Sequence, residues 1–541
     1  MGKRFANGFN HRFDQLSRGY GSYTARAVRA LAVCGAVYAC LIAIAGWRFV
    51  ETPTGFIPAQ DQGYLIGVIQ TPPGASLQRT TEVLAEAQRV ALKTAGVNGT
   101  LAFAGFDGAS FTNAPNSGAM FVTLAPKEER GPVEGIIKDL SGRLAQVTAG
   151  NILVVQPPAV RGIGTGGGYK MIIEDRSGAG YRALEEVAQR MVGKAKQTPG
   201  LARVFTTFNT RTPRLYADID RERAERLGVP VDTVFRTLGT YLGSTYIDDF
   251  NFLGRTYRVT AEADAPYRDN ISDVERLRTR SDSGAMVPLA SVMNVRNDSG
   301  PYRVVRYNLY PAAELQGDTV KGYSSGQSLA SMEQLAAQVL PRGFSYDWTE
   351  LAFQEKQAGN SGAVAFVLAV VFVFLLLAAL YESLVLPLAV ILIVPMCLLA
   401  AIVGVNIMRL DNNILTQIGL VVLIGLAAKN AILIVEFAKQ NEEAGDDRRE
   451  AARHAAATRL RPILMTSIAF ILGTLPLVIG NAPGSEMRQA LGVAVFFGMI
   501  GVTLFGLLFT PAFYVITRNL GDSISLKVRR RRTLQPVGAP V

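Results

Sequence analysis

The stretch GLAAKNAILIVEFAK, residues 425–439, places a lysine inside one of the longest apolar runs of the chain. Lys429 lies near the middle of that run, where water cannot solvate an ammonium group. An uncompensated lysine at membrane depth costs roughly 2.5 to 3.5 kcal/mol even on the lenient insertion scale. Such a residue usually faces the bundle interior and pairs with an acid. The stretch therefore predicts a membrane helix that carries a functional charge.

The apolar runs of the 541-residue chain cluster towards its two ends, and the middle has ordinary globular composition. Hydrophobic residues make up 49% of the chain, so we expect a membrane part and a soluble part. A bilayer is crossed by about 20 apolar residues in a helix. The first run is expected to act as a signal-anchor rather than as a cleaved signal peptide. Six spans are predicted, at residues 28–50, 361–381, 386–405, 414–438, 462–479 and 490–516.

The net charge of +11 is concentrated beside the predicted spans. Basic residues dominate residues 1–27, the loop 439–461 and the tail 517–541, which contains KVRRRR. The positive-inside rule places all three in the cytoplasm, so this charge indicates topology rather than nucleic-acid binding. We expect a cytoplasmic amphipathic N-terminus and a basic cytoplasmic tail. The region between the first two spans must then lie outside the cytoplasm.

The extracytoplasmic region alternates period-2 apolar segments with helix-length amphipathic ones. Residues 51–160 give the order βαββαβ, which is typical of ferredoxin-like domains. The order recurs in residues 161–214 and 300–350, interrupted by an inserted subdomain at 215–299. The predicted fold is an α-helical membrane bundle of six spans with an α+β region of two ferredoxin-like subdomains and one insertion.

Other patterns argue against enzymatic chemistry. The run GTGGG at 164–168 precedes a strand and lacks the Gly-Lys-Ser/Thr of a phosphate loop, so a hinge between subdomains is the better interpretation. The three cysteines fall in apolar runs and provide no disulfide framework. The only two histidines are His11 and His454, both on the predicted cytoplasmic side. We predict neither a catalytic site nor a metal site.

Three stretches closely resemble the resistance–nodulation–division (RND) transporters, in the hydrophobe/amphiphile efflux class of AcrB-like pumps. They are residues 54–65 (TGFIPAQDQGYL), 425–439 and 459–477 (RLRPILMTSIAFILGTLPL). One span, a large periplasmic region and five further spans match the C-terminal half of such a pump. The resemblance implies drug or amphiphile efflux, driven by the proton gradient without a cofactor. It also implies a bacterial inner-membrane homotrimer that works with a periplasmic adaptor, an outer-membrane channel and an N-terminal half.

The resemblance also implies a proton relay around Lys429. The nearest acid on the same helix is Glu436, about 10 Å away along the axis, which is too far for a direct pair. The implied partner is an adjacent pair of aspartates on a helix of the N-terminal half. Arg459 and Thr466 match relay positions on the next helix, and Asn430 could add a hydrogen bond. A structural ion pair remains the alternative for Lys429, and a bond to its own backbone the alternative for Thr466.

Substrates of this family bind among aromatic side chains of the periplasmic subdomains. The resemblance implies substrate-binding roles for Tyr169 and Met171 on one strand face, and for a group of phenylalanines in the first subdomain: Phe103, Phe106, Phe111 and Phe121. Many relatives have a phenylalanine where Gly108 stands, and Phe111 could compensate. Core packing is the alternative for each phenylalanine.

Two other functions remain open. A truncated or split chain could act only as a membrane interaction module without autonomous transport. A metal-exporting relative ranks lower, because Met120 and Met171 form no evident methionine ladder.

Overall fold

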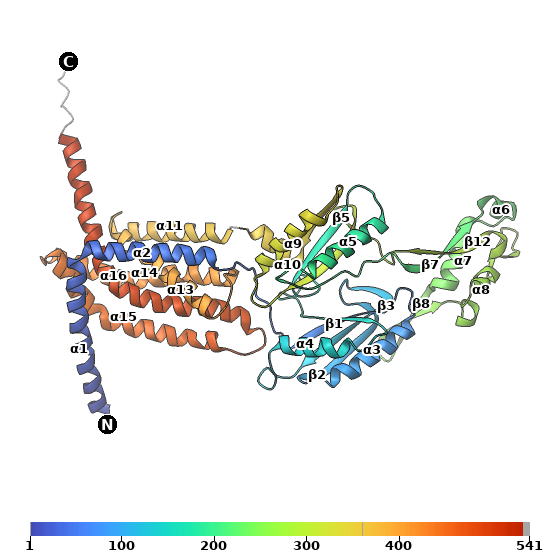
Figure 1. The fold of residues 1–541 in the computed structure, drawn as a ribbon, viewed down its shortest axis with the longest axis horizontal. Coiled ribbons are helices and arrows are strands. Elements are labelled where there is room, and N and C mark those ends of the chain that lie inside the picture. Colours follow the sequence, from blue (N-terminus) through green and yellow to red (C-terminus); the bar gives the residue numbers. More distant parts are fainter. Residues whose placement is uncertain (1, 360, 534–541) are drawn as a thin grey trace, which may run out of the picture. The chain divides into compact units, whose positions relative to one another are not determined.

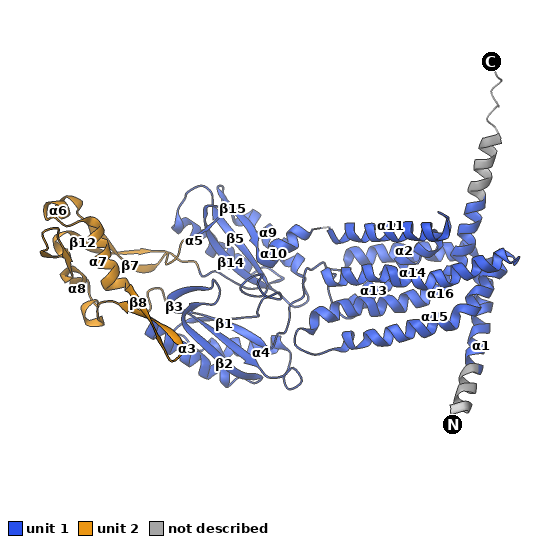
Figure 2. Cartoon of the chain, turned by 180° about the vertical axis from the view of Figure 1, so that it is seen from behind, with its two compact units in different colours: residues 1–71, 77–207, 305–541 blue, residues 72–76, 208–304 orange. Residues whose placement is uncertain are grey.

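The computed structural model describes residues 2–359 and 361–533, with side chains over 11–359 and 361–522. The chain forms two compact units (Figure 2). The first comprises residues 1–71, 77–207 and 305–541, and the second comprises 72–76 and 208–304. The part of the predicted tail at 534–541 lies outside the described residues.

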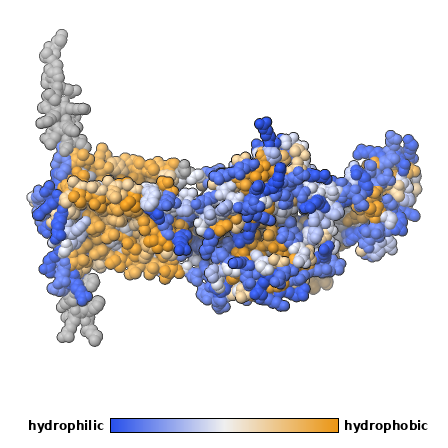
Figure 3. Space-filling view, in the orientation of Figure 1, coloured by the Kyte–Doolittle hydropathy of each residue, from blue (hydrophilic) through white to orange (hydrophobic). Residues whose placement is uncertain are grey.

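Six helices of the described chain are long and apolar enough to cross a membrane, which agrees with the predicted number of spans. The helices run side by side in Figure 1, and apolar side chains cover them in Figure 3. The third span consists of two helical segments, α12 and α13. The bounds are α2 (Leu31–Glu51), α11 (Ser361–Tyr381), α12 (Leu386–Ile391), α13 (Val394–Ile407), α14 (Ile414–Glu443), α15 (Arg448–Ile479) and α16 (Ser485–Thr533).

The third span differs from the continuous helix that its apolar run predicts. It breaks between Ile391 and Val394, and Pro395 sits in the first turn of α13. Proline has no backbone N–H and is tolerated where a helix begins, because the first N–H groups have no intrahelical partner. The break therefore follows from Pro395, which the hydrophobic pattern conceals.

The predicted basic loop at 439–461 is largely helical. Helix α14 continues to Glu443, and α15 already begins at Arg448, so only residues 444–447 connect them. The Asp447 side chain caps α15 by accepting a hydrogen bond from the Arg449 N–H. The helices therefore extend beyond the predicted span bounds, because charge marks where a helix leaves the bilayer, not where it ends.

Small residues allow the membrane helices to approach closely. A Cβ at Gly498 of α16 would overlap Leu423 of α14, and one at Gly501 would overlap Ala400 of α13. Lipid tails are as apolar as the helices, so close packing of this kind is a main source of helix association in membranes. Helix α16 is thus packed against both α13 and α14.

Helix α1 (Gly2–Arg29) lies across one end of the bundle in Figure 1 and contains the predicted amphipathic N-terminus. Ser17 Oγ donates to the Ala457 carbonyl at 3.2 Å, and Tyr20 Oη donates to the Leu507 carbonyl at 2.7 Å. These bonds attach α1 to α15 and α16.

The first soluble layer has the strand order β2-β3-β1-β4, with every neighbouring pair antiparallel. Its apolar face, including Leu65, Ile69 and Met120, packs on the two helices. The elements are β1 (Tyr64–Gln70), α3 (Leu77–Leu92), β2 (Val97–Asp107), β3 (Thr112–Leu124), α4 (Val133–Leu144) and β4 (Asn151–Val155).

The second soluble layer has the order β13-β14-β5-β15, and β6 also pairs with β14. Helices α5 and α9 contact each other and cover strands of this sheet. The elements are β5 (Tyr169–Asp175), α5 (Tyr181–Ala195), β6 (Leu201–Phe205), β13 (Val305–Tyr307), β14 (Tyr310–Thr319), α9 (Ser325–Val339), β15 (Phe344–Thr349) and α10 (Glu350–Ala358).

The second unit contains the predicted insertion at 215–299 and has its own core around Val234, Leu289 and Val292. Its strands form three antiparallel pairs, β7 with β12, β8 with β9 and β10 with β11. The elements are β7 (Thr212–Ile219), α6 (Arg221–Arg226), α7 (Val231–Gly243), β8 (Thr245–Phe252), β9 (Arg255–Ala261), η1 (Ala265–Tyr267), α8 (Ile271–Arg276), β10 (Arg278–Arg280), β11 (Met286–Pro288), η2 (Leu289–Ser291) and β12 (Met293–Gly300).

Candidate functional site

Lys429 lies on an exposed stripe of α14. The stripe consists of Ile418, Val422, Gly425 and Lys429, whose spacing of three and four residues puts them on one helix face. Within the side chains described for this chain, no hydrogen bond or ion pair reaches Lys429. The nearest acid along the helix, Glu436, accepts a hydrogen bond from Gln440 instead. The lysine therefore presents a charge on a face that no described element covers.

The neighbouring Asn430 points the other way, into the bundle. Its Nδ2 donates to Ser467 Oγ of α15 at 3.1 Å, and both residues are buried. The structure thus connects α14 to α15 one residue beyond the lysine. Ser467 was not predicted, although it directly follows Thr466, and its small size among larger apolar residues is the only signal that could have identified it.

The two predicted relay residues of α15 make local contacts. Thr466 is exposed, and its hydroxyl donates to the Ile463 carbonyl at 3.1 Å, which is the backbone bond considered above as its alternative. The Arg459 guanidinium lies 4.1 Å from the ring centroid of Phe437 on α14. Arg459 Nε is buried and has no hydrogen-bond partner among the described atoms. Neither side chain bonds to Lys429 in this part of the chain, so their relay role stays a prediction.

A charged cluster that the sequence did not reveal joins three membrane helices. It connects the end of α14, the start of α15 and the second half of α16. Glu442 near the end of α14 accepts from Arg448 at 3.1 Å and from Arg518 at 3.0 Å. Tyr514 of α16 also donates to this carboxylate. Two arginines and a hydroxyl therefore satisfy Glu442 and fix the end of α14 to α15 and α16.

A second missed cluster lies at the start of α14, where the carboxyl group of Asp411 acts on that of Glu355 from α10. Ser325 Oγ of α9 donates to Glu355 Oε1 at 3.0 Å and accepts from the Phe56 N–H at 3.1 Å. Asp411 Oδ1 accepts from Asn413 Nδ2 at 2.8 Å. Burial, with the charge of Asp411 adding to it, raises the pKa of Glu355 to about 7. Burial also raises the pKa of Asp411.

The four predicted phenylalanines form one chain of ring contacts across β2, β3 and the turn between them. Ring centroids are 6.0 Å apart for Phe121 and Phe103, 6.4 Å for Phe103 and Phe106, and 5.5 Å for Phe106 and Phe111. All three pairs are edge-to-face, the geometry that aromatic rings favour. Phe103 is 44% exposed and Phe111 is 52% exposed, so these two rings are open to solvent, whereas Phe121 packs against a small buried cluster.

Tyr169 and Met171 occupy a different environment. Both lie on β5 and are buried, with Met171 fully enclosed. The Tyr169 ring packs perpendicular to Trp348 with centroids 6.0 Å apart, and its hydroxyl has no hydrogen-bond partner in the described structure. Burial raises the pKa of that hydroxyl. The structure does not join these two side chains to the phenylalanine chain, and their substrate role stays a prediction.

The segment between the two soluble layers is held by a buried polar network. Lys170 Nζ lies 2.6 Å from Glu350 Oε1 and donates to Thr165 Oγ1 at 3.0 Å. Thr165 in turn donates to the Ala109 carbonyl at 2.8 Å, and Gln316 Nε2 donates to the same carbonyl at 3.1 Å. Thr165 therefore connects the glycine run at 164–168 to both layers. Its hinge role stays a prediction.

Comparison with known proteins supplies the context for this arrangement. Residues 1–518 match the model of the AcrB/AcrD/AcrF family. The chain is 37% identical over 522 residues to the multidrug export protein AcrF of Escherichia coli K12, covering 95% of this chain and 50% of the relative. It is 35% identical over 525 residues to the multidrug/solvent efflux pump membrane transporter MepB of Pseudomonas putida, covering 96% and 50%.

The multidrug resistance protein MdtF of Escherichia coli K12 is 34% identical over 522 residues, with 95% of this chain and 50% of the relative covered. The chain thus spans about half the length of the curated relatives it matches. Together with the six spans, the relatives make it a multi-pass inner-membrane protein. With the family match over residues 1–518, the chain belongs to the AcrB/AcrD/AcrF family of AcrB-like RND efflux transporters.

Proposed function

We propose that the chain is the C-terminal half of a pump that exports drugs and other amphiphilic compounds, driven by the proton gradient and without a cofactor. The names of its relatives, which describe multidrug export and solvent efflux, support this substrate class. The N-terminal half, a homotrimer, a periplasmic adaptor and an outer-membrane channel complete the proposed assembly.

The single observation that carries the proposal is the unpaired Lys429 on the open stripe of α14. A lysine at membrane depth needs an opposite charge, and no described residue supplies it. The proposed partner is a pair of aspartates on a helix of the N-terminal half. When one aspartate takes a proton, its attraction for Lys429 falls and α14 can shift.

The contacts of α14 supply a route for that shift. The bond from Asn430 to Ser467 would move α15 with α14, while the Glu442 cluster holds the far ends of the helices together. Thr466 and Arg459 are proposed to guide protons along α15.

The soluble layers are proposed to be two ferredoxin-like porter subdomains, at 51–160 and at 161–214 with 300–350. Their strand orders, read with the helices between the strands, support this assignment. Residues 215–299 are the proposed docking subdomain. Substrates would bind along the phenylalanine chain, whose Phe103 and Phe111 are exposed, with Tyr169 and Met171 of the second layer completing the path.

The test is drug susceptibility in a pump-deficient strain that expresses this chain with a candidate N-terminal half. Lys429→Met should abolish resistance while leaving the membrane level of the protein unchanged. Lys439→Met is the matched control, since Lys439 lies on the same helix with only a 4.0 Å contact to Glu443. Resistance that survives Lys429→Met would overturn the proposal.

The open face around Lys429 also favours a second candidate, an interaction module without autonomous transport. The same strain separates the two. Resistance restored only by co-expression with a half that carries the paired aspartates supports the split pump. Stable association with that half and no resistance under any condition supports the module.

A further inference from the structure

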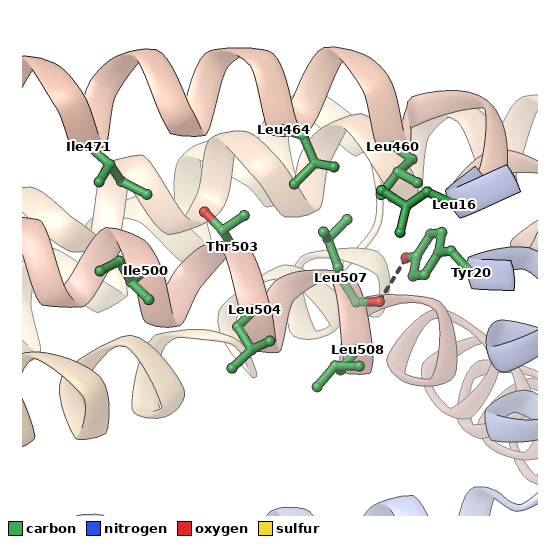
Figure 4. A pocket seen from close by; sticks show the side chains of 10 residues that line it. All are labelled: Leu16, Tyr20, Leu460, Leu464, Ile471, Ile500, Thr503, Leu504, Leu507 and Leu508. Atoms are coloured by element: carbon green, nitrogen blue, oxygen red, sulfur yellow. Dashed lines mark hydrogen bonds between the residues drawn. The ribbon is translucent and has the colours of Figure 1, made fainter. Parts of the chain in front are cut away.

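A groove runs between α1, α15 and α16 in the membrane bundle, with a volume of about 410 Å³. Figure 4 shows its lining, with Leu16 and Tyr20 of α1 at one end and Ile471 and Ile500 at the other. Leu464 and Leu504 line the stretch between them.

The lining offers no free hydrogen-bond donor. Among the residues that line it, only Tyr20 and Thr503 carry hydroxyl groups. Tyr20 Oη donates to the Leu507 carbonyl, and Thr503 Oγ1 donates to the Met499 carbonyl at 2.7 Å. A polar ligand would lose its hydrogen bonds with water here without replacement, so the groove selects an apolar occupant.

The length of the groove matches one leaflet of a bilayer. On α15 its lining extends from Leu460 to Ile471, which is about 16 Å at 1.5 Å per residue. The hydrocarbon core of a bilayer is about 30 Å thick, so the groove covers roughly half of it. Its α1 end lies beside the basic segment that the positive-inside rule places in the cytoplasm.

Basic side chains stand at that end. Arg12 is exposed and lies one turn before Leu16 on the same face of α1. Arg461 lies one turn before Leu464 and packs 5.7 Å from the ring centroid of Phe13. Asp14 is the only acid among the described side chains of α1. The apolar groove therefore opens towards positive charge at the level of the headgroups.

We propose that the groove binds one acyl chain of an anionic phospholipid of the cytoplasmic leaflet, whose phosphate is held by Arg12 and Arg461. The bound chain would fill the space that the three helices leave open and would fix α1 against the bundle. The proposal depends on the membrane topology and is independent of the proposed pumping.

The test uses the full chain reconstituted in phosphatidylcholine vesicles. Leu504→Trp, in a Trp47→Phe background, places a fluorescent reporter in the groove, while Trp348 stays outside the spans. Leu376→Trp on α11 is the control, because it is 57% exposed in the cytoplasmic half of another span. Brominated phosphatidylglycerol or brominated phosphatidylcholine is then titrated in as the quencher.

We expect the groove reporter to be quenched by brominated phosphatidylglycerol at several-fold lower mole fraction than by brominated phosphatidylcholine. The α11 reporter should not distinguish the two lipids. Arg12→Gln and Arg461→Gln should each reduce the preference by about fivefold, the effect of one basic residue near an anionic surface. Arg409→Gln, at the other end of the bundle, should leave it unchanged.

Three outcomes would overturn the proposal. Equal quenching at both reporters means ordinary lipid contact. An absence of quenching in the groove means that protein covers it. Quenching that an amphiphilic dye relieves, whatever the headgroup, means that the groove takes transport substrates. Size-exclusion profiles matching the parent protein establish that each variant is folded.

Discussion

Asn430 Nδ2 donates a hydrogen bond of 3.1 Å to Ser467 Oγ, and this buried bond joins α14 to α15 directly beside Lys429. Hydrogen bonds between membrane helices contribute about 0.6 kcal/mol on average. Asn430→Ala and Ser467→Ala should therefore show a coupling free energy near that value in a double-mutant cycle. The free energies are obtained from unfolding in mixed micelles of increasing denaturing detergent. Strictly additive effects of the two substitutions would show that the bond does not stabilise the bundle.

The phenylalanine chain should act as a binding surface more than as a core. Phe106→Ala removes the ring that contacts both Phe103 and Phe111, so we expect several-fold weaker binding of an amphiphilic fluorescent probe. Truncating a phenylalanine that packs in a core to alanine would lower the free energy of unfolding by about 3 to 5 kcal/mol. Phe250→Ala, which removes an exposed aromatic of the second unit, is the matched control. A large fall in Tm with unchanged probe affinity would identify Phe106 as a packing residue.

Stability should depend on pH through Glu355. Burial raises the pKa of Glu355 from its ordinary 4.5 to about 7, so the folded protein binds a proton that the unfolded chain has released. The resulting stabilisation is fully present below pH 4.5 and is lost as the pH rises through 7. We expect Tm to fall between pH 5 and 8 and this slope to flatten in Glu355→Gln. Glu222→Gln, on an exposed helix, should keep the parent slope, and an unchanged slope in Glu355→Gln would contradict the assignment.

Close packing of α16 should be sensitive to added volume at one glycine and not at another. Gly498→Val would force its side chain into Leu423, and overpacking of this kind costs about 1 to 3 kcal/mol. Gly506→Val on the same helix is the control, because, apart from the adjacent backbone of α16, no described heavy atom lies within 4 Å of a Cβ there. The comparison is made from the Tm of both variants in one detergent. Equal losses would point to helix propensity rather than packing.

The parts of the fold that local sequence decides were predictable. The length of each apolar run indicates a span without knowledge of its neighbours, and the change from period 2 to amphipathic segments gave the order of strands and helices. Lys429 was also identifiable as a candidate functional residue, because a charge inside an apolar run is anomalous in its own segment. Pro395 was visible too, but the apolar run around it concealed the break in the helix.

Contacts between distant segments were not predictable. Glu442 meets Arg518 across 76 residues, and Glu355 lies beside Ser325 and Asp411 from two other segments. Their residue types are unremarkable in isolation, and only the tertiary structure brings them together. For Tyr169 and Met171, alternation predicts that both share a strand face but cannot tell whether that face is open or buried.

The Glu442 cluster has a mechanical consequence. It fixes one end of α14, so a tilt of this helix would be a rotation about that end, which acts as the pivot. Lys429 is about 20 Å from the pivot and Ile414 about 42 Å, at 1.5 Å per residue. A sideways displacement of α14 at Lys429 therefore becomes about twice as large at Ile414. The Ile414 N–H donates to the Phe56 carbonyl at 3.0 Å, so this displacement reaches the loop that leads into β1 of the first sheet.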